Sequence, residues 1–555
     1  MAASTSKHAV RRLLETAECA WPSRRHLGRA APAGVMAPIR CAQHSSPKAE
    51  VRHLSTKAGK QPAKERYNYN TSLSFSEEPD PDHVNYRRVT ASELVSRREP
   101  PTRVKMLVRD FIDDSLYNPN YGYFARNATI FSPPKDGYDF ASFRDTAAFQ
   151  EAVAERYERE YGRLEADGGG LGRQVWHTPT ELFKPHYARS LTSALLSAYK
   201  VNHFPDQDLI IYEVGAGNGS FMVDCLTFLR DEHPEVYAKT QYRIIEISGM
   251  LSKGQRERAK KEGFGDRVKV INEDFFKWEG GGSEPCFVVA LEVFDNFAHD
   301  MLRYDLNTLT PLQAVVAIDA TSDFSLLYEP LTDPLLRRSL AYRRLLPTSS
   351  STSPPISAPL LMSPLLRKAY ASLPFAPNLS EPDFIPTKAV MFLERLRDRL
   401  PAHRLLVADF DELPEAVEGR NGPVVQTRYG DSMVPCETFL VKQGYFDIFF
   451  PTDFELLRDV YSLIMNSPPR LSLSASTPTP GHNFFSSHPA PASDPLDPPI
   501  APGTGVQGFR RRAVGVYKHK EFLETFGGEK EVRQTRTKDG GNVMTGMYGN
   551  AKMMF

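Results

Sequence analysis

Three alternate glycines stand where the sequence predicts that a strand ends and a helix begins. The apolar run 209–214 is typical of a buried strand of a parallel sheet, and Gly215, Gly217 and Gly219 follow it. Glycine permits positive φ and removes the Cβ atom that would hold a ligand away from the backbone. The first turn of a helix adds unpaired N–H donors. This order of elements predicts a nucleotide-cofactor pocket at the carboxyl edge of a sheet, with a plain turn as the alternative.

Two acids flank this loop. Glu213 lies two residues before the first glycine, and the resulting pattern E-x-G-x-G-x-G resembles the first motif of S-adenosylmethionine-dependent methyltransferases. The dinucleotide fingerprint G-x-G-x-x-G is incomplete, because Ser220 occupies its last position. Glu246 ends the next predicted strand, where a carboxylate can accept hydrogen bonds from both ribose hydroxyls. That role suits an S-adenosylmethionine site and an NAD site equally.

A second acid–aromatic pair follows the strand predicted over 268–271. Asp274 is placed to meet an adenine amine, and Phe275 to cover the adenine ring. The alternative, held equally, is that Asp274 caps the turn before Phe275.

Two further carboxylates, Glu292 and Asp295, come directly after the strand predicted over 287–291. At the carboxyl end of a strand beside the cofactor loop, they lie where a substrate must approach. Carboxylates bind the planar guanidinium of arginine in a fork and can orient one nitrogen for methyl transfer, which requires no metal. The alternative is that both acids cap the next helix and face water.

Composition bounds the class of protein. The 555 residues are 41% hydrophobic with a mean hydropathy of −0.41, as expected for a soluble chain with a large core. The 68 basic and 68 acidic residues cancel, so no overall field favours nucleic acid. Five cysteines without a C-x-x-C pair argue against a zinc site and a disulfide framework. No run approaches the roughly 18 apolar residues of a membrane span.

The chain divides by composition. Residues 1–60 hold eleven Lys and Arg against three Glu and no Asp, which predicts a mitochondrial transit peptide or, alternatively, a basic tail. A linker is predicted over 61–100, followed by a catalytic domain over 101–465. This domain is predicted to carry a surface insertion at about 130–175 and a Ser/Pro-rich insertion at about 346–380. A disordered linker over 466–508 and a C-terminal segment over 509–555, whose role stays open, complete the predicted order. Within the domain, helical spacing begins at Val104, and 424–427 is expected to be an edge strand.

Several segments together resemble, in order, the MidA-like family, which includes the mitochondrial arginine methyltransferase that assists assembly of respiratory complex I. They are Asn118-Pro119-Asn120-Tyr121-Gly122-Tyr123, Thr178-Pro179, Glu213 to Gly219, Glu246, Glu292-Val293-Phe294-Asp295, and the late segment Phe446 to Phe454. The resemblance covers residues 104 to about 465. Leu291 and Phe297-Ala298 depart from the family's acidic motif, and either Thr180 or Glu181 takes the place of the glutamate that follows Thr-Ser-Pro in the family.

The sequence therefore predicts an α/β protein with a doubly wound, mostly parallel seven-strand methyltransferase-type sheet and a helical insertion. The resemblance implies an S-adenosylmethionine-dependent protein arginine methyltransferase of the mitochondrial matrix that acts on a complex I subunit, with no metal. Two alternatives stay open: an assembly scaffold that has lost catalysis, and an NAD-dependent oxidoreductase, which the incomplete fingerprint disfavours. Oligomeric state and the exact substrate are not predicted.

Overall fold

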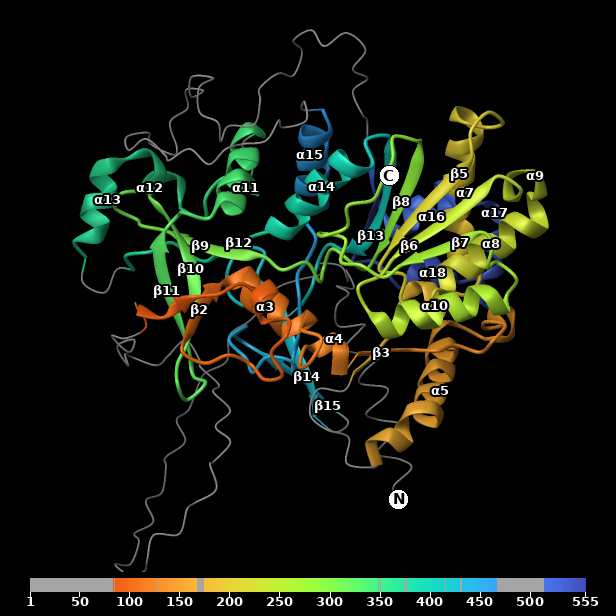
Figure 1. Cartoon of the computed structure of the whole chain (residues 1–555), viewed down its shortest axis with the longest axis horizontal. Helices are drawn as coiled ribbons and strands as arrows, with labels where there is room; N and C mark the ends of the chain where they lie inside the picture. Colours follow the sequence, from red (N-terminus) through yellow and green to blue (C-terminus); the bar gives the residue numbers. More distant parts are fainter. Residues whose placement is uncertain are drawn as a thin grey trace, which may run out of the picture.

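The computed structural model describes residues 83, 85–126, 128–166, 174–347, 349, 351–373, 377–414, 416–429, 432–466 and 514–555. The predicted transit peptide, residues 1–60, and residues 467–508 of the predicted linker lie outside them. The main sheet has seven strands, shown at the right of Figure 1, in the order β17-β18-β13-β8-β5-β6-β7. Their bounds are β5 Leu209–Val214, β6 Thr240–Ile245, β7 Val268–Ile271, β8 Cys286–Leu291, β13 His403–Phe410, β17 Val516–Lys518 and β18 Ala551–Met554.

This sheet is covered on both faces, because successive side chains of a strand point to opposite sides. Along β8, Phe287 and Val289 enter one core, and Val288 and Ala290 enter the other. The first core is closed by α5 Thr146–Ala166, α7 His186–Asn202, α8 Ser220–Glu232, α10 Gly249–Lys261, α16 His519–Phe526 and α18 Val543–Gly546. The second is closed by α11 Pro334–Leu345, α14 Thr387–Arg399 and α15 Phe454–Met465. The predicted α/β class is therefore confirmed.

The C-terminal segment belongs to this sheet. The five strands from β7 to β13 are parallel, whereas β18 runs antiparallel to both β13 and β17. Met553 enters the first core and Met554 the second. The sheet thus extends past residue 465, where the sequence analysis ended the catalytic domain.

A second, six-stranded sheet stands beside the first, at the left of Figure 1. Its strands are β1 Arg87–Arg88, β2 Val104–Leu107, β9 Asp300–Tyr304, β10 Pro311–Ile318, β11 Phe324–Pro330 and β12 Asp383–Ile385. Most of them lie between β8 and β13 in the chain, so this sheet is a large insertion joined by the N-terminal strands. The short helices α12 Ala358–Met362 and α13 Pro364–Ala371 project from it.

Three expectations about local structure need correction. The region 130–175, predicted as a surface insertion, carries β3 Ala128–Ile130, α5 and β4 Gln174–Trp176, and buries Phe140, Phe149 and Tyr157 in the first core. The helix predicted from Val104 is instead β2 followed by α3 Val108–Tyr117. Over a short run, the same apolar residues fit the period of a strand as well as that of a helix. Part of the predicted linker 61–100 forms β1 and α2 Ala91–Leu94.

The predicted edge strand over 424–427 is also different. It forms β14 Val424–Tyr429, the central strand of a three-stranded sheet between β15 Ser432–Cys436 and β16 Asp447–Phe449. Its partners are supplied from later in the chain, which the local pattern does not show.

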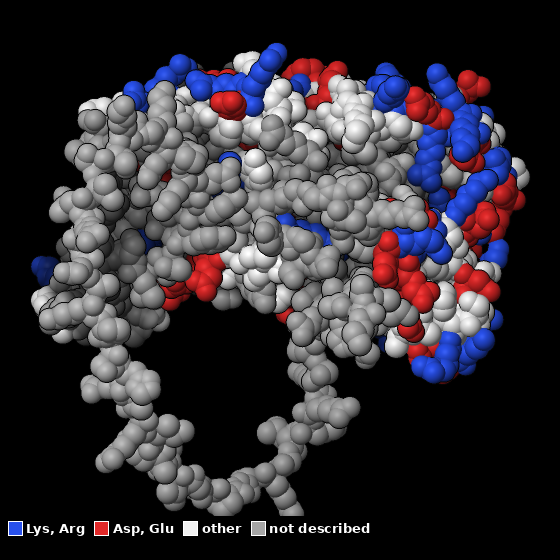
Figure 2. Space-filling model, turned by 90° about the horizontal axis from the view of Figure 1, so that it is seen from below, with Lys and Arg blue, Asp and Glu red and all other residues white. Residues whose placement is uncertain are grey.

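Charge is well mixed on the surface that can be seen. In Figure 2, Lys and Arg side chains alternate with Asp and Glu over the uncovered right-hand part of the face.

Among the described residues, no helix is long and apolar enough to cross a membrane, and no group of three or more His, Cys, Asp or Glu side chains is arranged to hold a metal ion.

Candidate active site

The glycine loop joins β5 to α8 with three residues in the left-handed region. The φ angles of Gly215, Gly217 and Gly219 are 71°, 50° and 73°, which side chains rarely allow. A Cβ atom at Gly215 would come within 3.1 Å of Val293 Cγ2, and one at Gly217 within 3.0 Å of Ile130 Cδ1. The loop therefore requires glycine both for its backbone shape and for close contact with neighbouring segments.

Three buried or half-buried side chains hold this loop from outside. Glu181 accepts hydrogen bonds from Asn218 Nδ2 at 3.1 Å and Ser220 Oγ at 2.8 Å. Gln255 Nε2 donates to the carbonyl of Gly217 at 2.8 Å, and Arg258 Nη1 donates to the carbonyl of Asn218 at 2.9 Å. Sequence reasoning assigned no role to Gln255 or Arg258.

Glu181, and not Thr180, meets the glycine loop. Thr178 caps the short helix α6 Pro179–Leu182 by accepting from the N–H of Glu181. This cap and the buried position of Glu181 aim its carboxylate at the start of α8.

Glu213 lies in β5, Glu246 directly follows the adjacent parallel strand β6, and both are buried. Glu213 Oε2 accepts from the hydroxyl of Tyr242 at 2.7 Å, and burial raises the pKa of Glu213 to about 7. Glu246 accepts from the N–H of Ser248 at 2.9 Å and from Gln255 Nε2 at 3.0 Å. Because Gln255 also bonds Gly217, the structure brings Glu246 and the glycine loop together, as the sequence predicts.

Asp274 and Phe275 are placed differently from a ligand-facing pair. Asp274 Oδ1 accepts from the N–H of Phe276 at 2.9 Å, which is the turn-capping alternative. Phe275 is buried in the second core, with its ring 4.4 Å from that of Phe392. Half-buried Phe276, with Lys388 Nζ 4.4 Å from its ring centroid, keeps some surface. The structure thus gives no contact that favours adenine recognition by Phe275.

The acidic loop, residues 292–299, leaves the carboxyl end of β8 with a constrained backbone. Glu292 has a φ of 53°, a left-handed conformation that costs free energy for a residue with a side chain. Its carboxylate is half-buried and has no hydrogen-bond partner among the described residues. Asp295 is 2% exposed, and its Oδ1 likewise meets no donor in the part of the chain described. Both predicted substrate carboxylates therefore have free acceptor capacity.

Contacts from other elements fix the acidic loop. Asp409, at the end of β13, accepts at Oδ2 from the N–H groups of Phe294 at 2.9 Å and Asp295 at 3.1 Å. The N–H of Phe450 donates to the carbonyl of Asp295 at 2.8 Å, and the hydroxyl of Tyr117 donates to that of Asn296 at 3.1 Å. Asp409 was missed by sequence reasoning, although an acid ending a buried strand was a visible signal.

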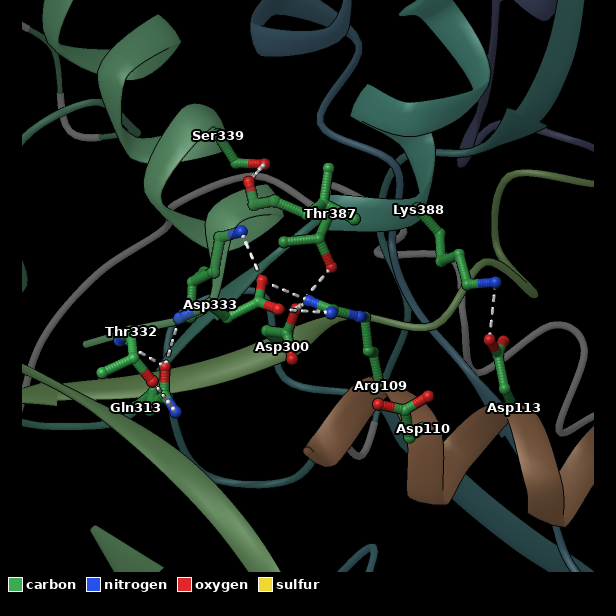
Figure 3. A network of polar contacts seen from close by, with 12 residues as sticks. Arg109, Asp110, Asp113, Asp300, Gln313, Thr332, Asp333, Ser339, Thr387 and Lys388 are labelled. Atoms are coloured by element: carbon green, nitrogen blue, oxygen red, sulfur yellow. Dashed lines mark hydrogen bonds and ion pairs between the residues drawn. The ribbon is translucent and has the colours of Figure 1, made fainter. Parts of the chain in front are cut away.

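A buried ion-pair network anchors the far end of the loop, at Asp300 (Figure 3). Arg109 on α3 donates to Asp300 Oδ2 at 2.6 Å and, through both terminal nitrogens, to Asp333 at 2.7 and 2.6 Å. Thr387 Oγ1 also donates to Asp300, at 2.8 Å, and Asp333 caps α11. The network ties α3, β9, α11 and α14 together, so the loop is held at both ends.

Several acidic groups are buried together here, and burial disfavours their charged forms. Burial first, and then the charge of neighbouring carboxylates, raises the pKa of Glu292 and of Asp295 well above the usual range. Burial raises the pKa of Asp409 to about 7, and also raises that of Asp447, which contributes to the field at Asp295. No Lys or Arg of the described residues is among the groups that shift the pKa of Glu292 or Asp295. A cationic ligand would relieve this repulsion.

The residues present are compatible with S-adenosylmethionine, which supplies a methyl group on a sulfonium when bound. Among the described residues, the N–H groups of Gly217 and Asn218 have no backbone acceptor, so both can donate to a ligand. A carboxylate has about four lone-pair sites, so the bonds that Glu246 accepts from Ser248 and Gln255 leave acceptor capacity for a ribose hydroxyl. The acidic loop lies beside the glycine loop, because the Cβ position of Gly215 is close to Val293 Cγ2.

Comparisons with known proteins also indicate a methyltransferase. The family model described as "Putative S-adenosyl-L-methionine-dependent methyltransferase" matches residues 190–468, half of the chain. A curated relative, "Protein arginine methyltransferase NDUFAF7 homolog, mitochondrial" of Schizosaccharomyces pombe, is 23% identical over 380 residues, which cover 65% of this chain and 76% of the relative.

Solved structures are more distant. A crystal structure from Burkholderia thailandensis with S-adenosyl-homocysteine bound is 15% identical, with a TM-score of 0.38 and coverage of 70% of this chain and 83% of that chain. A methyltransferase from Geobacter sulfurreducens is 18% identical, with a TM-score of 0.16 and coverage of 21% and 39%. From the family match, the chain belongs to the S-adenosyl-L-methionine-dependent methyltransferases, and S-adenosylmethionine is its cofactor.

Proposed function

We propose that this methyltransferase modifies arginine side chains of proteins in mitochondria, and that its substrate is a complex I subunit during assembly. The observation that carries the arginine assignment is the acidic loop. Two carboxyl groups with free acceptor capacity, Glu292 and Asp295, lie beside the cofactor loop with no cation of the described chain to neutralise them. A guanidinium is a planar cation whose donors match carboxylates in pairs.

The loop's own chemistry supports this role. Glu292 would hold the guanidinium plane so that one nitrogen faces the methyl donor, and proximity in a dry site supplies much of the rate. A carboxyl group with a raised pKa is also a better acceptor for the proton that this nitrogen loses on methylation. Asp409 would act as a positioning residue, because its carboxylate is already engaged by the backbone of the loop.

For the cofactor, we assign the glycine loop and the acids around it on the seven-strand, methyltransferase-type sheet. Gly215, Gly217 and Gly219 would let the ligand approach the backbone, and Glu246 would hold the ribose. Glu213 would support the loop from the sheet, through Tyr242. Asp274 stays a weaker candidate, since its carboxylate already caps a turn.

Support for the location and the partner comes from sequence likeness. The relative from Schizosaccharomyces pombe is named a mitochondrial protein arginine methyltransferase. The basic, acid-poor residues 1–60 have the composition of a transit peptide, which would direct the protein to the mitochondrial matrix. The proposal that the substrate is a complex I subunit rests on the motif resemblance to the MidA-like family.

Two departures from the family's acidic motif favour a second candidate, a scaffold that binds the cofactor without catalysis. Leu291 and Phe297-Ala298 replace residues of the family's acidic motif. Such a protein would bind S-adenosylmethionine and a complex I subunit but transfer no methyl group.

The test uses the full chain, S-adenosylmethionine with an isotopically labelled methyl group, and a matrix protein fraction depleted of the endogenous enzyme. Hydrolysis and mass analysis should find label in methylarginine, and the Glu292→Gln variant should lose it. Label in methyllysine or in no amino acid, with normal cofactor binding, would contradict the arginine assignment.

A further inference from the structure

Large apolar side chains are exposed together on the two short helices α12 and α13. We call residues 358–373, which comprise both helices and the two residues after them, the apolar tip. Neither helix has a buried residue. Its large exposed side chains, with their exposed fractions, are Met362 at 85%, Leu365 at 79%, Leu366 at 49% and Leu373 at 57%. Single exposed apolar residues are ordinary, but a group of this kind indicates an interaction surface.

The apolar tip has a defined shape although it belongs to no buried core of the described chain. Arg367 of α13 donates through Nη1 to the carbonyls of Leu360 at 2.8 Å and Leu361 at 3.1 Å, both in α12. Its Nε donates to the carbonyl of Asn307, in the loop after β9, at 3.2 Å. Ser363 caps α13 with its side chain. These polar contacts hold the helices together and leave their apolar side chains outside.

The position of the apolar tip favours a soft partner. The N–H of Ser380 donates to the carbonyl of Tyr304 at 2.9 Å, which fixes the returning chain to β9. From this base α12 and α13 project at the left edge of the molecule in Figure 1, at the end opposite the main sheet. A rigid protein partner would need a hollow that matches this projection. The interfacial region of a lipid bilayer accepts a projecting apolar group without a preformed hollow.

Charge around the apolar tip favours an anionic partner. Residues 334–380 contain six Lys and Arg and no Asp or Glu, in a chain whose acidic and basic residues are equal in number. Two of these arginines form ion pairs with acids outside the run. Arg367 bonds carbonyl oxygens, which leave its charge uncompensated, and Lys368 beside it is exposed. Positive charge therefore accompanies the exposed apolar side chains.

We propose that the apolar tip is a docking surface for a lipid bilayer that contains anionic phospholipid. Its leucine and methionine side chains enter the boundary between headgroups and acyl chains, while Arg367 and Lys368 stay at the level of the phosphates. Apolar area and attraction to anionic lipid act together at such a surface. This inference does not rest on the proposed function, because docking of this kind requires neither cofactor nor acceptor.

The test measures sedimentation of the full chain with phosphatidylcholine vesicles, prepared with and without phosphatidylglycerol. We expect wild type to prefer the anionic vesicles and to bind them less tightly as salt is raised. The double variant Met362→Ser/Leu365→Ser should weaken this binding on the order of tenfold or more, since two apolar side chains no longer enter the bilayer. Lys368→Gln should weaken it about fivefold, as expected for one lysine near an anionic surface.

Val201→Ser is the matched control. Val201 is 83% exposed on α7, away from the apolar tip, and this variant should bind vesicles like wild type. The basic residues 1–60 are the same in all these proteins, so any attraction of theirs to anionic lipid does not affect the comparison. Because the substituted side chains are exposed, the melting temperature of each variant should match that of wild type.

Wild type that does not sediment with anionic vesicles overturns the inference, as does a folded double variant that binds them like wild type. A dimer that dissociates on Met362→Ser/Leu365→Ser, without vesicle binding, would assign the surface to a second copy of the chain and also overturn it. If the double variant does not fold, Leu365→Ser alone takes its place. Failure of the proposed function is seen separately, as the absence of methylarginine from the labelled matrix proteins.

Discussion

At the scale of single residues, the site combines backbone strain with an acidic group whose charged form is disfavoured by burial, both at Glu292. Glu292 adopts a φ of 53° and carries a carboxylate that no described residue satisfies. Both features oppose folding, and residues that keep such costs are concentrated at functional positions. Two substitutions separate the contributions of charge and backbone.

Glu292→Gln keeps the shape of the side chain and removes its charge. We expect methyl transfer to fall on the order of a hundredfold, since a positioned charged group in a dry site is lost. Affinity for S-adenosylmethionine and the melting temperature should change little, because no cavity or unpaired buried charge is created. Turnover, calorimetry and melting on one preparation test this. A variant that methylates at the wild-type rate would exclude Glu292 as the guanidinium clamp.

Glu292→Gly and Glu292→Ala both remove the carboxylate, but only glycine relieves the left-handed backbone. The glycine variant should therefore unfold with a free energy about 1 kcal/mol higher than the alanine variant, while both lose methyl transfer. Urea denaturation of the two variants gives this difference directly. Equal stability would mean that the backbone at residue 292 is not strained.

The raised pKa of Asp409 makes stability depend on pH in a defined direction. Its ordinary value is 3.8 and its folded value is about 7, so between these values the folded chain keeps a proton that the unfolded chain releases. The free energy of unfolding should therefore fall as pH rises from about 4 to about 7 and then level off. Asp409→Asn should flatten this slope in urea titrations. Asp145→Asn, at an exposed carboxyl whose pKa is lowered by hydrogen bonds, should not.

At the scale of elements, the position of the acidic loop depends on contacts that cross the insertion. Arg109 joins α3 to Asp300 and Asp333, which lie about 190 and 220 residues further along the chain. A sequence pattern shows that Arg109 is on a helix but not which acids it meets. The same holds for Glu181 and Gln255, whose partners in the glycine loop come from other elements.

Arg109→Met should lower the free energy of unfolding by about 3 to 5 kcal/mol, because two buried carboxylates lose their cation. Arg533→Met, which breaks an exposed pair with Glu529, should cost less than about 0.5 kcal/mol and serves as the control. Thermal and urea unfolding compare the two. Similar small effects would show that the Arg109 network contributes specificity of packing rather than stability.

At the scale of the whole molecule, local pattern was informative where an element's role depends on its own residues. The strand, glycine turn and helix over 209–232, the acid at 246 and the strands predicted over 268–271 and 287–291 are all present where predicted. Prediction was poor where charge or glycine masks a sparse apolar set: the aromatic residues of 140–157 are too widely spaced among acids and bases to mark a core helix by eye. The sequence did not predict β17 and β18, because strands this short are stabilised only by pairing with the sheet that they join.

The largest consequence concerns the C-terminal segment. A chain that ends at residue 465, where the sequence placed the end of the catalytic domain, would lose β17, β18, α16 and α18. Phe522, Leu523 and Met553 would leave the first core and Met554 the second, while β13 would become an unpaired edge with its apolar faces uncovered. We expect this truncated chain to lose its cooperative thermal transition and to bind hydrophobic dye. Removal of residues 1–82 is the matched control, because their composition predicts a transit peptide and a polar linker, and should leave the melting temperature unchanged. A truncated chain that melts cooperatively and still binds S-adenosylmethionine would show that the five parallel strands suffice for the fold.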